Sequence, residues 1–140
     1  MAIAASQATA GKRARILVVD DDPQVREPLL LSLRRQGYGA DGAADGLEAL
    51  HHLQHGQFDV VLTDLQMPRL DGLALLREIR RRGYLQAVVI QTTLLDSSLD
   101  VILRHAGASG VLMKGGPFGD LVRSVEEAYR ASHDSSAHAS

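Results

Sequence analysis

The sequence has 140 residues, of which 45% are hydrophobic and 23% charged, and its formal net charge is −2 at pH 7. This length suits one domain with a proper core, and the composition is that of an ordinary soluble globular protein. The charge lacks the basic surplus that a nucleic-acid-binding protein usually has, and the absence of cysteine excludes a disulfide framework and a cysteine-based metal site.

The two ends of the chain carry few bulky apolar residues. The basic residues of the first segment come last, which reverses the order of a secretory signal. No stretch approaches the roughly 18 apolar residues that span a bilayer. We therefore expect a cytoplasmic protein without a membrane partner. The sequence predicts flexible tails at 1–14 and 132–140 around one folded domain at 15–131.

Five apolar runs predict the strands of one sheet. Three of them are continuous and rich in β-branched residues, which is typical of parallel strands covered on both faces. Gly39 and Gly42 weaken the second run, so we expect that strand at an edge of the sheet. The runs are 16–19, 38–40, 60–63, 87–90 and 110–113.

Helical patterns alternate with these runs. Asp22 is expected to be the N-cap of the first helix, with Pro23 at its first position. The first two helices are expected to present apolar faces made of Val25, Leu29 and Leu33, and of Leu47, Leu50 and Leu53. The alternation predicts a doubly wound α/β domain with a five-stranded parallel sheet. The expected helices are 24–36, 45–55, 71–83, 96–107 and 117–131.

Polar side chains directly follow four of the runs, as Asp20–Asp22, Asp64, Thr92 and Lys114. The carboxyl ends of parallel strands meet at one edge of a sheet, where ligands bind, so we expect these side chains to converge. Carboxylates this close need a cation, and an oxygen-only set favours Mg²⁺, Mn²⁺ or Ca²⁺. A lysine and a hydroxyl can bind a phosphoryl group, and a carboxylate can accept one.

Four segments carry a resemblance to a known family. ILVVDDDPQVRE, DVVLTDLQMPRLDGL, VVIQTT and GASGVLMKGG resemble the receiver domain of bacterial two-component response regulators, over about residues 14 to 130. The resemblance implies a flavodoxin-like (βα)5 fold, a three-layer sandwich. It implies that Asp64 is the phospho-acceptor, Thr92 the switch hydroxyl and Lys114 the phosphate-contacting lysine.

The same resemblance implies a metal site. Asp21 is implied to be a direct ligand of Mg²⁺, or of Mn²⁺, and Asp20 to act largely through water. Asp64 and the backbone carbonyl of Gln66 complete the implied protein ligands. Asp22 has no implied role in the family, which agrees with its expected place as an N-cap.

The implied function is that of a single-domain response regulator. A histidine kinase or histidine phosphotransfer protein would donate the phosphoryl group to Asp64, and the domain would then signal to a downstream protein or relay the group. It would not be an enzyme in the usual sense, although it assists its own phosphorylation and dephosphorylation. No direct contact with nucleic acid is expected.

Three departures from the family pattern bear on switching. Lys114 is followed by Gly115-Gly116-Pro117 instead of directly by proline. Val111 stands where the family usually has an aromatic switch residue, and Thr93 follows Thr92 where a small residue is common. Leu94 is apolar and cannot orient an attacking water, which predicts slow self-hydrolysis of an aspartyl phosphate.

Two alternatives remain open from the sequence. One is a receiver fold used as a docking module that is indifferent to phosphate, which Val111 and Thr93 favour. The other is a phosphatase of the haloacid-dehalogenase type, which also places D-x-D after its first strand. That class needs further metal-binding acids on a later strand, whereas the acids after Lys114 fall in a predicted helix.

Overall fold

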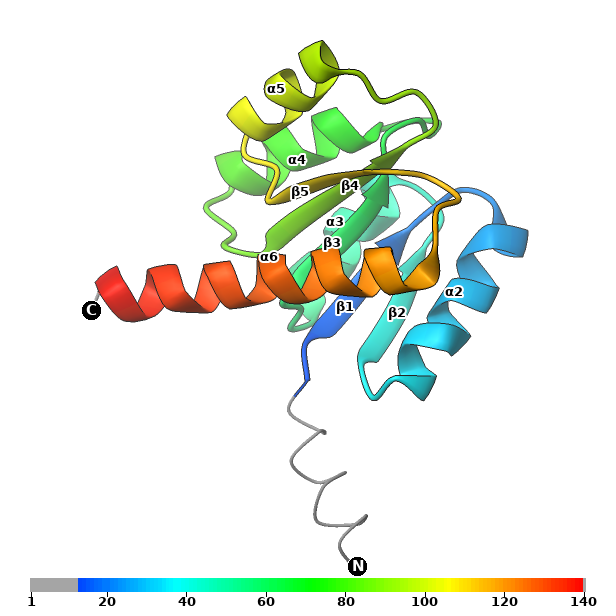
Figure 1. Ribbon diagram of the computed structural model, residues 1–140, viewed down its shortest axis with the longest axis horizontal. Coiled ribbons are helices and arrows are strands. Elements are labelled where there is room, and N and C mark those ends of the chain that lie inside the picture. The colour runs from blue at the N-terminus through cyan, green and yellow to red at the C-terminus, as the bar shows by residue number, and fades with distance from the viewer. Residues whose placement is uncertain (1–12, 140) are drawn as a thin grey trace, which may run out of the picture.

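The computed structural model describes residues 13–139, with side chains described as far as His133. Its centre is one parallel five-stranded sheet in the order β2-β1-β3-β4-β5 (Figure 1). The predicted parallel sheet is confirmed, and so is the edge position of the weak second strand. The strands are β1 (Arg15–Val19), β2 (Gly39–Ala43), β3 (Val60–Asp64), β4 (Ala87–Thr92) and β5 (Gly110–Met113).

Helices cover both faces of the sheet. They are α2 (Pro23–Arg35), α3 (Gly46–His55), α4 (Gly72–Arg81), α5 (Ser97–His105) and α6 (Phe118–Ala139). In Figure 1, α6 crosses in front of the sheet and α3 lies behind it. The apolar side chains form two separate clusters, one under α3, α4 and α5 and the other under α2 and α6. The fold is therefore the predicted three-layer, doubly wound sandwich.

The central strands are the most deeply covered elements. Every residue of β3 and of β4 is buried, and four of the five residues of β1 are buried. This burial matches the continuous apolar runs from which the strands were predicted, because a strand between two helical layers has no solvent face.

The predicted apolar faces of the first two helices were partly wrong. Val25 is 38% exposed and Leu47 is 51% exposed, whereas Leu30 and Leu33 are the buried residues of α2. Because leucines occupy positions 29, 30 and 31, the sequence alone does not show which of them face the core. Leu47 lies in the first turn of α3. There the preceding Gly46, and not Leu47, lies close to the neighbouring loop, at Leu70.

Regular packing and helix extend beyond residues 15–131 at both ends of the predicted domain. Ala14 is 1% exposed and packs in the cluster under α2 and α6, so the folded part begins before residue 15. Residues 1–12 of the predicted tail at 1–14 lie outside the described residues. At the other end α6 continues to Ala139, past the predicted boundary at Ala131. The segment after Ala131 contains no glycine or proline to end the helix.

Candidate functional site

Three carboxylates meet at the carboxyl edge of the sheet. Asp20 and Asp21 directly follow β1, and Asp64 is the last residue of the neighbouring strand β3. The register pairs Val19 with Thr63, which brings Asp20 beside Asp64. One oxygen from each carboxylate lies within 4.8 Å of the others. Asp20 and Asp64 are 3% and 7% exposed, whereas Asp21 is exposed to solvent.

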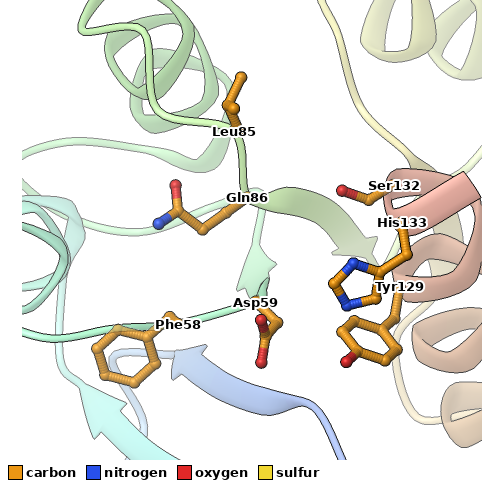
Figure 2. Close-up of a pocket in the computed structure, with 7 residues that line it drawn as sticks. All are labelled: Phe58, Asp59, Leu85, Gln86, Tyr129, Ser132 and His133. Atoms are coloured by element: carbon orange, nitrogen blue, oxygen red, sulfur yellow. The ribbon is translucent and has the colours of Figure 1, made fainter. Parts of the chain in front are cut away.

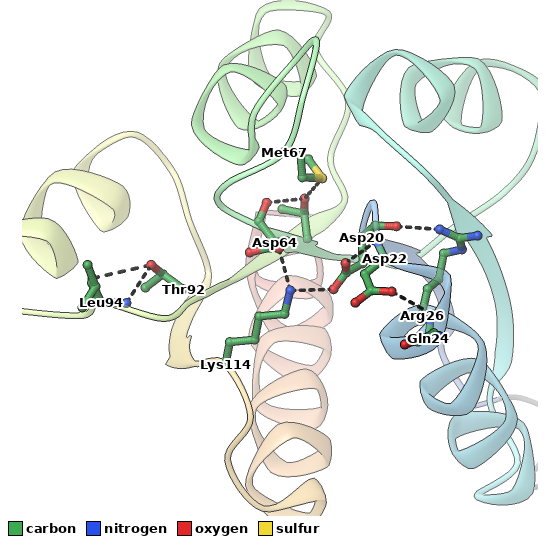
Figure 3. A network of polar contacts seen from close by, with 10 residues as sticks. Asp20, Asp22, Gln24, Arg26, Asp64, Met67, Thr92, Leu94 and Lys114 are labelled. Carbon is green, nitrogen blue, oxygen red and sulfur yellow. Dashed lines mark hydrogen bonds and ion pairs between the residues drawn. The ribbon is translucent and has the colours of Figure 1, made fainter.

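Lys114 reaches this cluster from the edge strand (Figure 3). It follows β5, and its Nζ lies 2.9 Å from Oδ2 of Asp20 and 2.6 Å from Oδ2 of Asp64. Burial lowers the pKa of this ammonium, but hydrogen bonds and charge attraction from both carboxylates outweigh burial and raise the pKa overall. Lys114 is therefore a permanent cation between two buried acids.

Three hydrogen bonds that involve side chains hold the turn after β1. The Asp22 side chain accepts from the Gln24 amide at 2.9 Å, which confirms Asp22 as the N-cap of α2. The Asp22 amide donates to Oδ1 of Asp20, also at 2.9 Å. Nη1 of Arg26 donates to the backbone carbonyl of Asp20 at 2.7 Å. The aspartate run therefore consists of two site acids and a helix cap.

Sequence reasoning missed Arg26. Its side chain lies one helical turn after the N-cap, and side chains on a helix lean toward the helix N-terminus. That lean is the signal that could have placed the guanidinium of Arg26 near the acidic turn.

Thr92 ends β4 at the same edge and is 1% exposed. Within the described residues its hydroxyl bonds only with Leu94, accepting from the Leu94 amide at 3.3 Å. The backbone carbonyl of Thr92 accepts from the Lys114 amide at 2.8 Å, which ties the loop after β5 to β4. The structure therefore brings Asp20, Asp64 and Lys114 into contact, whereas the Thr92 hydroxyl contacts Leu94 and makes no hydrogen bond to these three residues.

The loop after Asp64 is fixed at both ends. The Leu65 amide donates to the Gln91 carbonyl and the Gly72 amide donates to the Leu65 carbonyl, each at 2.8 Å. A Cβ on Gly72 would lie 2.5 Å from the Asp64 carbonyl, so α4 can pack this closely only with glycine there. Gln66 lies in this loop with an exposed side chain, two residues after Asp64.

A salt bridge fastens the same loop to α3. Arg69 adopts a left-handed backbone conformation with φ 68° and donates through Nε to Oδ2 of Asp45 at 2.9 Å. Asp45 is the N-cap of α3 and accepts from the Glu48 amide. Burial raises the pKa of the Asp45 carboxyl, but the Glu48 amide and Arg69 together outweigh burial and lower the pKa overall. The loop after Asp64 is therefore anchored to α3.

The residues that depart from the family pattern lie close to this edge. Val111 is partly buried in β5, and Thr93 and Leu94 are exposed in the loop after β4. Gly115 has φ 82°, a conformation that glycine adopts without strain, and open space surrounds it. The segment after Lys114 therefore has more conformational freedom than a Lys-Pro connection would give.

A cavity of about 200 Å³ lies at the opposite, amino edge of the sheet (Figure 2). It is lined in part by Phe58, Asp59, Gln86 and Tyr129, residues before β3 and β4 or on α6. None of the converging acids or Lys114 lines it. We therefore place the candidate site at the carboxyl edge, away from this cavity.

The donor set of the acidic cluster fits a hard divalent cation. It offers carboxylate oxygens only, from Asp20, Asp21 and Asp64, with no histidine or cysteine among them. Such oxygens are the ligands that Mg²⁺ and Mn²⁺ prefer, and an incomplete shell leaves room for a phosphoryl oxygen.

A doubly wound sheet with this strand order, an acidic cluster at its carboxyl edge and a lysine from the last strand defines the class of receiver domains. Residues 16–126 match the family described as the response regulator receiver domain. The chain therefore belongs to the receiver domain family of two-component response regulators.

The curated relatives include the response regulators MprA of Mycobacterium sp. strain KMS and of Mycobacterium avium strain 104. They are 43% and 42% identical to this chain over 100 residues, which are 71% of the chain and 44% of each relative. The chain thus spans less than half the length of these relatives. In the described part of the chain, no helix has both the length and the apolar character needed to cross a membrane.

Solved receiver domains share the fold. The receiver domain of the Francisella response regulator 1452 superposes with a TM-score of 0.81 at 27% identity, covering 86% of this chain and 99% of that one. The response regulator TrrA of Thermotoga maritima, solved in complex with Mg²⁺ and BeF, has a TM-score of 0.73 at 33% identity, covering 83% and 99%. The chemotaxis protein CheY4 of Vibrio cholerae has a TM-score of 0.78 at 29% identity, covering 82% and 98%.

Proposed function

We propose that Asp64 accepts a phosphoryl group from a histidine kinase or a histidine phosphotransfer protein. The observation that carries the proposal is the contact of Lys114 with Asp64, 2.6 Å long, inside a cluster of three carboxylates. In the transfer, an Asp64 oxygen bonds to phosphorus while the bond from phosphorus to the donor's histidine nitrogen breaks. The released imidazole takes up a proton.

The residues around Asp64 have complementary roles in this proposal. Asp20, Asp21, Asp64 and the Gln66 carbonyl would hold Mg²⁺, or Mn²⁺, which supplies positive charge against the equatorial phosphoryl oxygens. Lys114, which contacts both Asp20 and Asp64, would supply a second positive charge beside Asp64. Catalysis is then positioning and electrostatic stabilisation, with no turnover of a separate substrate.

Signalling in this proposal starts at Thr92. Among the described residues its hydroxyl contacts only Leu94, at 3.3 and 3.5 Å, so a phosphoryl oxygen at Asp64 can compete for it. Movement of Thr92 would displace the exposed Thr93 and Leu94 and the start of α5. The result is a phosphorylation-dependent surface that a downstream protein reads, unless the group is relayed onward. Leu94 cannot orient a water, which supports slow hydrolysis of the aspartyl phosphate.

We also propose that this domain acts in the cytoplasm and makes no direct contact with nucleic acid. The net charge of −2 supports the last point, because a nucleic-acid-binding surface usually carries a basic surplus. The phosphatase alternative is disfavoured, since Asp120, Glu126 and Glu127 lie on α6 and not on a strand beside the cluster.

The test is phosphorylation with acetyl phosphate and Mg²⁺, followed by intact-mass measurement. We expect one added phosphoryl group on the wild type, none on Asp64→Asn, and none after chelation of the metal. A wild-type protein that binds Mg²⁺ and gains no phosphoryl group would contradict the proposal.

The second candidate is a docking module that ignores phosphate, favoured by Val111 in place of an aromatic switch residue. Copurification of partners with untreated and beryllofluoride-treated protein separates the two. Partners that change on treatment support phosphate-dependent signalling, whereas an identical set, retained by Asp64→Asn, supports docking.

A further inference from the structure

Arg26 is a charged side chain that the proposed chemistry does not use, yet it is largely buried next to the acidic turn. It lies on α2, its side chain is 16% exposed, and its Nη1 donates to the Asp20 backbone carbonyl at 2.7 Å. Its ion pair with Glu27, 3.2 Å long, involves a partner that is 63% exposed and is therefore weak. The bond to the Asp20 carbonyl is its main contact with the site.

This bond constrains the orientation of the peptide that joins the two acids. A peptide unit is planar, so a fixed Asp20 carbonyl also fixes the direction in which the chain enters Asp21. The Asp20 side chain has further restraints, from the Asp22 amide and from Lys114. The Asp21 carboxylate is exposed and makes no hydrogen bond or ion pair within the described residues, so among the contacts of those residues only the backbone restrains the point from which it can reach the cluster.

A glycine on the adjacent strand makes room for the arginine. Gly42 lies in β2 opposite Val18 of β1, and a Cβ on it would lie 3.0 Å from Cδ of Arg26 and 3.0 Å from Cδ1 of Leu30. Glycine weakens a strand, so its presence in β2 has a local cost. The missing side chain lets the stem of Arg26 pass over β2 to the turn after β1.

We propose that Arg26 is a positioning residue for the cation site, which orients the Asp20–Asp21 peptide so that the Asp21 carboxylate points into the cluster. The inference rests on the Mg²⁺ site of the proposed function. Arg26 touches neither the cation nor the phosphoryl group, and it acts through the backbone of Asp20. Its positive charge also offsets part of the repulsion among the three carboxylates.

The structure offers a matched control on the same helix. Arg34 also donates its guanidinium to a backbone carbonyl, that of Ala40, at 3.0 and 2.7 Å. It lies near the other end of α2, far from the acids. Arg34→Ala therefore removes the same kind of bond from the same helix without touching the turn after β1.

The experiment compares Mg²⁺ affinity by isothermal titration calorimetry for the wild type, Arg26→Ala, Arg26→Lys and Arg34→Ala. Partners that orient a metal ligand are typically worth about 10- to 100-fold in metal affinity, and we expect the lower end, about tenfold, for Arg26→Ala. Arg26→Lys keeps one charged donor and should recover to within about threefold of the wild type. Arg34→Ala should leave the affinity unchanged.

A second readout separates positioning from folding. Urea unfolding without Mg²⁺ should show similar losses for Arg26→Ala and Arg34→Ala, while only Arg26→Ala weakens Mg²⁺ binding. With acetyl phosphate, Arg26→Ala should need more Mg²⁺ for half-maximal phosphorylation and reach the wild-type rate at saturating Mg²⁺.

Unchanged Mg²⁺ affinity in a folded Arg26→Ala protein would overturn the inference, and so would an equal loss in Arg34→Ala. A wild type without measurable Mg²⁺ binding would overturn it as well. The affinity measurement does not require phosphorylation, so a wild type that binds Mg²⁺ without accepting phosphate would refute only the proposed function.

Discussion

At Lys114, a single side chain joins the edge of the sheet to its centre. The residue follows β5, whereas Asp64 ends β3, with β4 between them. Three carboxylates and one ammonium leave two net negative charges at the cluster. A divalent cation neutralises these two net negative charges, whereas a monovalent cation leaves one of them. The net charge of the four side chains therefore also favours Mg²⁺ over Na⁺ or K⁺.

Adjacent aspartates at this edge should respond differently to substitution. Asp21→Ala removes a proposed Mg²⁺ ligand, and we expect it to abolish phosphorylation by acetyl phosphate. Asp22→Asn keeps a good N-cap and should phosphorylate normally with little change in stability, whereas Asp22→Ala should lose about 1 kcal/mol of unfolding free energy. Intact mass and urea unfolding measure the two effects. Equal loss of phosphorylation in Asp21→Ala and Asp22→Asn would show that the run is wrongly divided.

Among the elements, α4 packs directly against Asp64. Its first residue, Gly72, lies against the Asp64 backbone, and its N-cap Asp71 accepts from the Ala74 amide at 2.8 Å. The loop between Asp64 and α4 is also held to α3 through Arg69 and Asp45. The position of Asp64 is therefore set by two helices as well as by its own strand.

Replacing Gly72 should disturb the acceptor directly. A Cβ there meets the Asp64 carbonyl at 2.5 Å and Cα of Leu65 at 2.9 Å, and both are backbone atoms that cannot rotate away. We expect Gly72→Ala to lose about 1–3 kcal/mol of unfolding free energy, as overpacking does, and to slow phosphorylation. Urea unfolding and acetyl phosphate labelling measure both.

Gly119 provides the control for this substitution. It lies in the first turn of α6, with no atom within 4 Å of an added Cβ. Gly119→Ala should be neutral or gain up to about 1 kcal/mol from helix propensity. Comparable losses at the two glycines would contradict the packing argument.

The elements also show how far the sequence could predict this structure. Apolar runs identified β1, β3, β4 and β5, and the expected convergence of the strand ends correctly placed Asp20, Asp64 and Lys114 together. The run at 38–40 gave only part of β2, because this strand includes Asp41, which pairs with Arg15 at 2.7 Å, and Gly42. A contact between one helix side chain and the backbone of another segment, such as the bond from Arg26 to the Asp20 carbonyl, produces no periodic sequence pattern from which it could be predicted. The roles of Thr92 and Gln66 stay predictions.

On the scale of the whole molecule, Tyr38 joins the first β-α-β unit to the last helix. It lies in the turn before β2, is 3% exposed, and its hydroxyl donates to Glu126 of α6. Burial, followed by the hydrogen bond and the negative charge of Glu126, raises the pKa of Tyr38 to about 12 from 10.0. The folded state therefore favours the neutral phenol.

This shift predicts a pH dependence of global stability. The contribution of Tyr38 is fully present below its unfolded pKa of 10.0 and is lost as the pH rises through the folded value of about 12. We expect Tyr38→Phe to cost about 1–2 kcal/mol of unfolding free energy near neutral pH. Urea unfolding of both proteins at about pH 8 and about pH 11 should show this difference shrinking at the higher pH. A constant difference would contradict the assignment.

Because of the strand order, one part of the site lies on central strands and the other part lies toward an edge of the sheet. Asp20, Asp21 and Asp64 are carried by β1 and β3, which lie at and beside the middle of the sheet, and every residue of β3 is buried. Lys114 and Thr92 belong to the side of the sheet where β5 is the open edge and α5 buries only Leu103. Side-chain burial is thus less complete near β5 and α5 than at β3. If Asp64 is phosphorylated as proposed, we expect the resulting structural change to extend outward to the β5 edge.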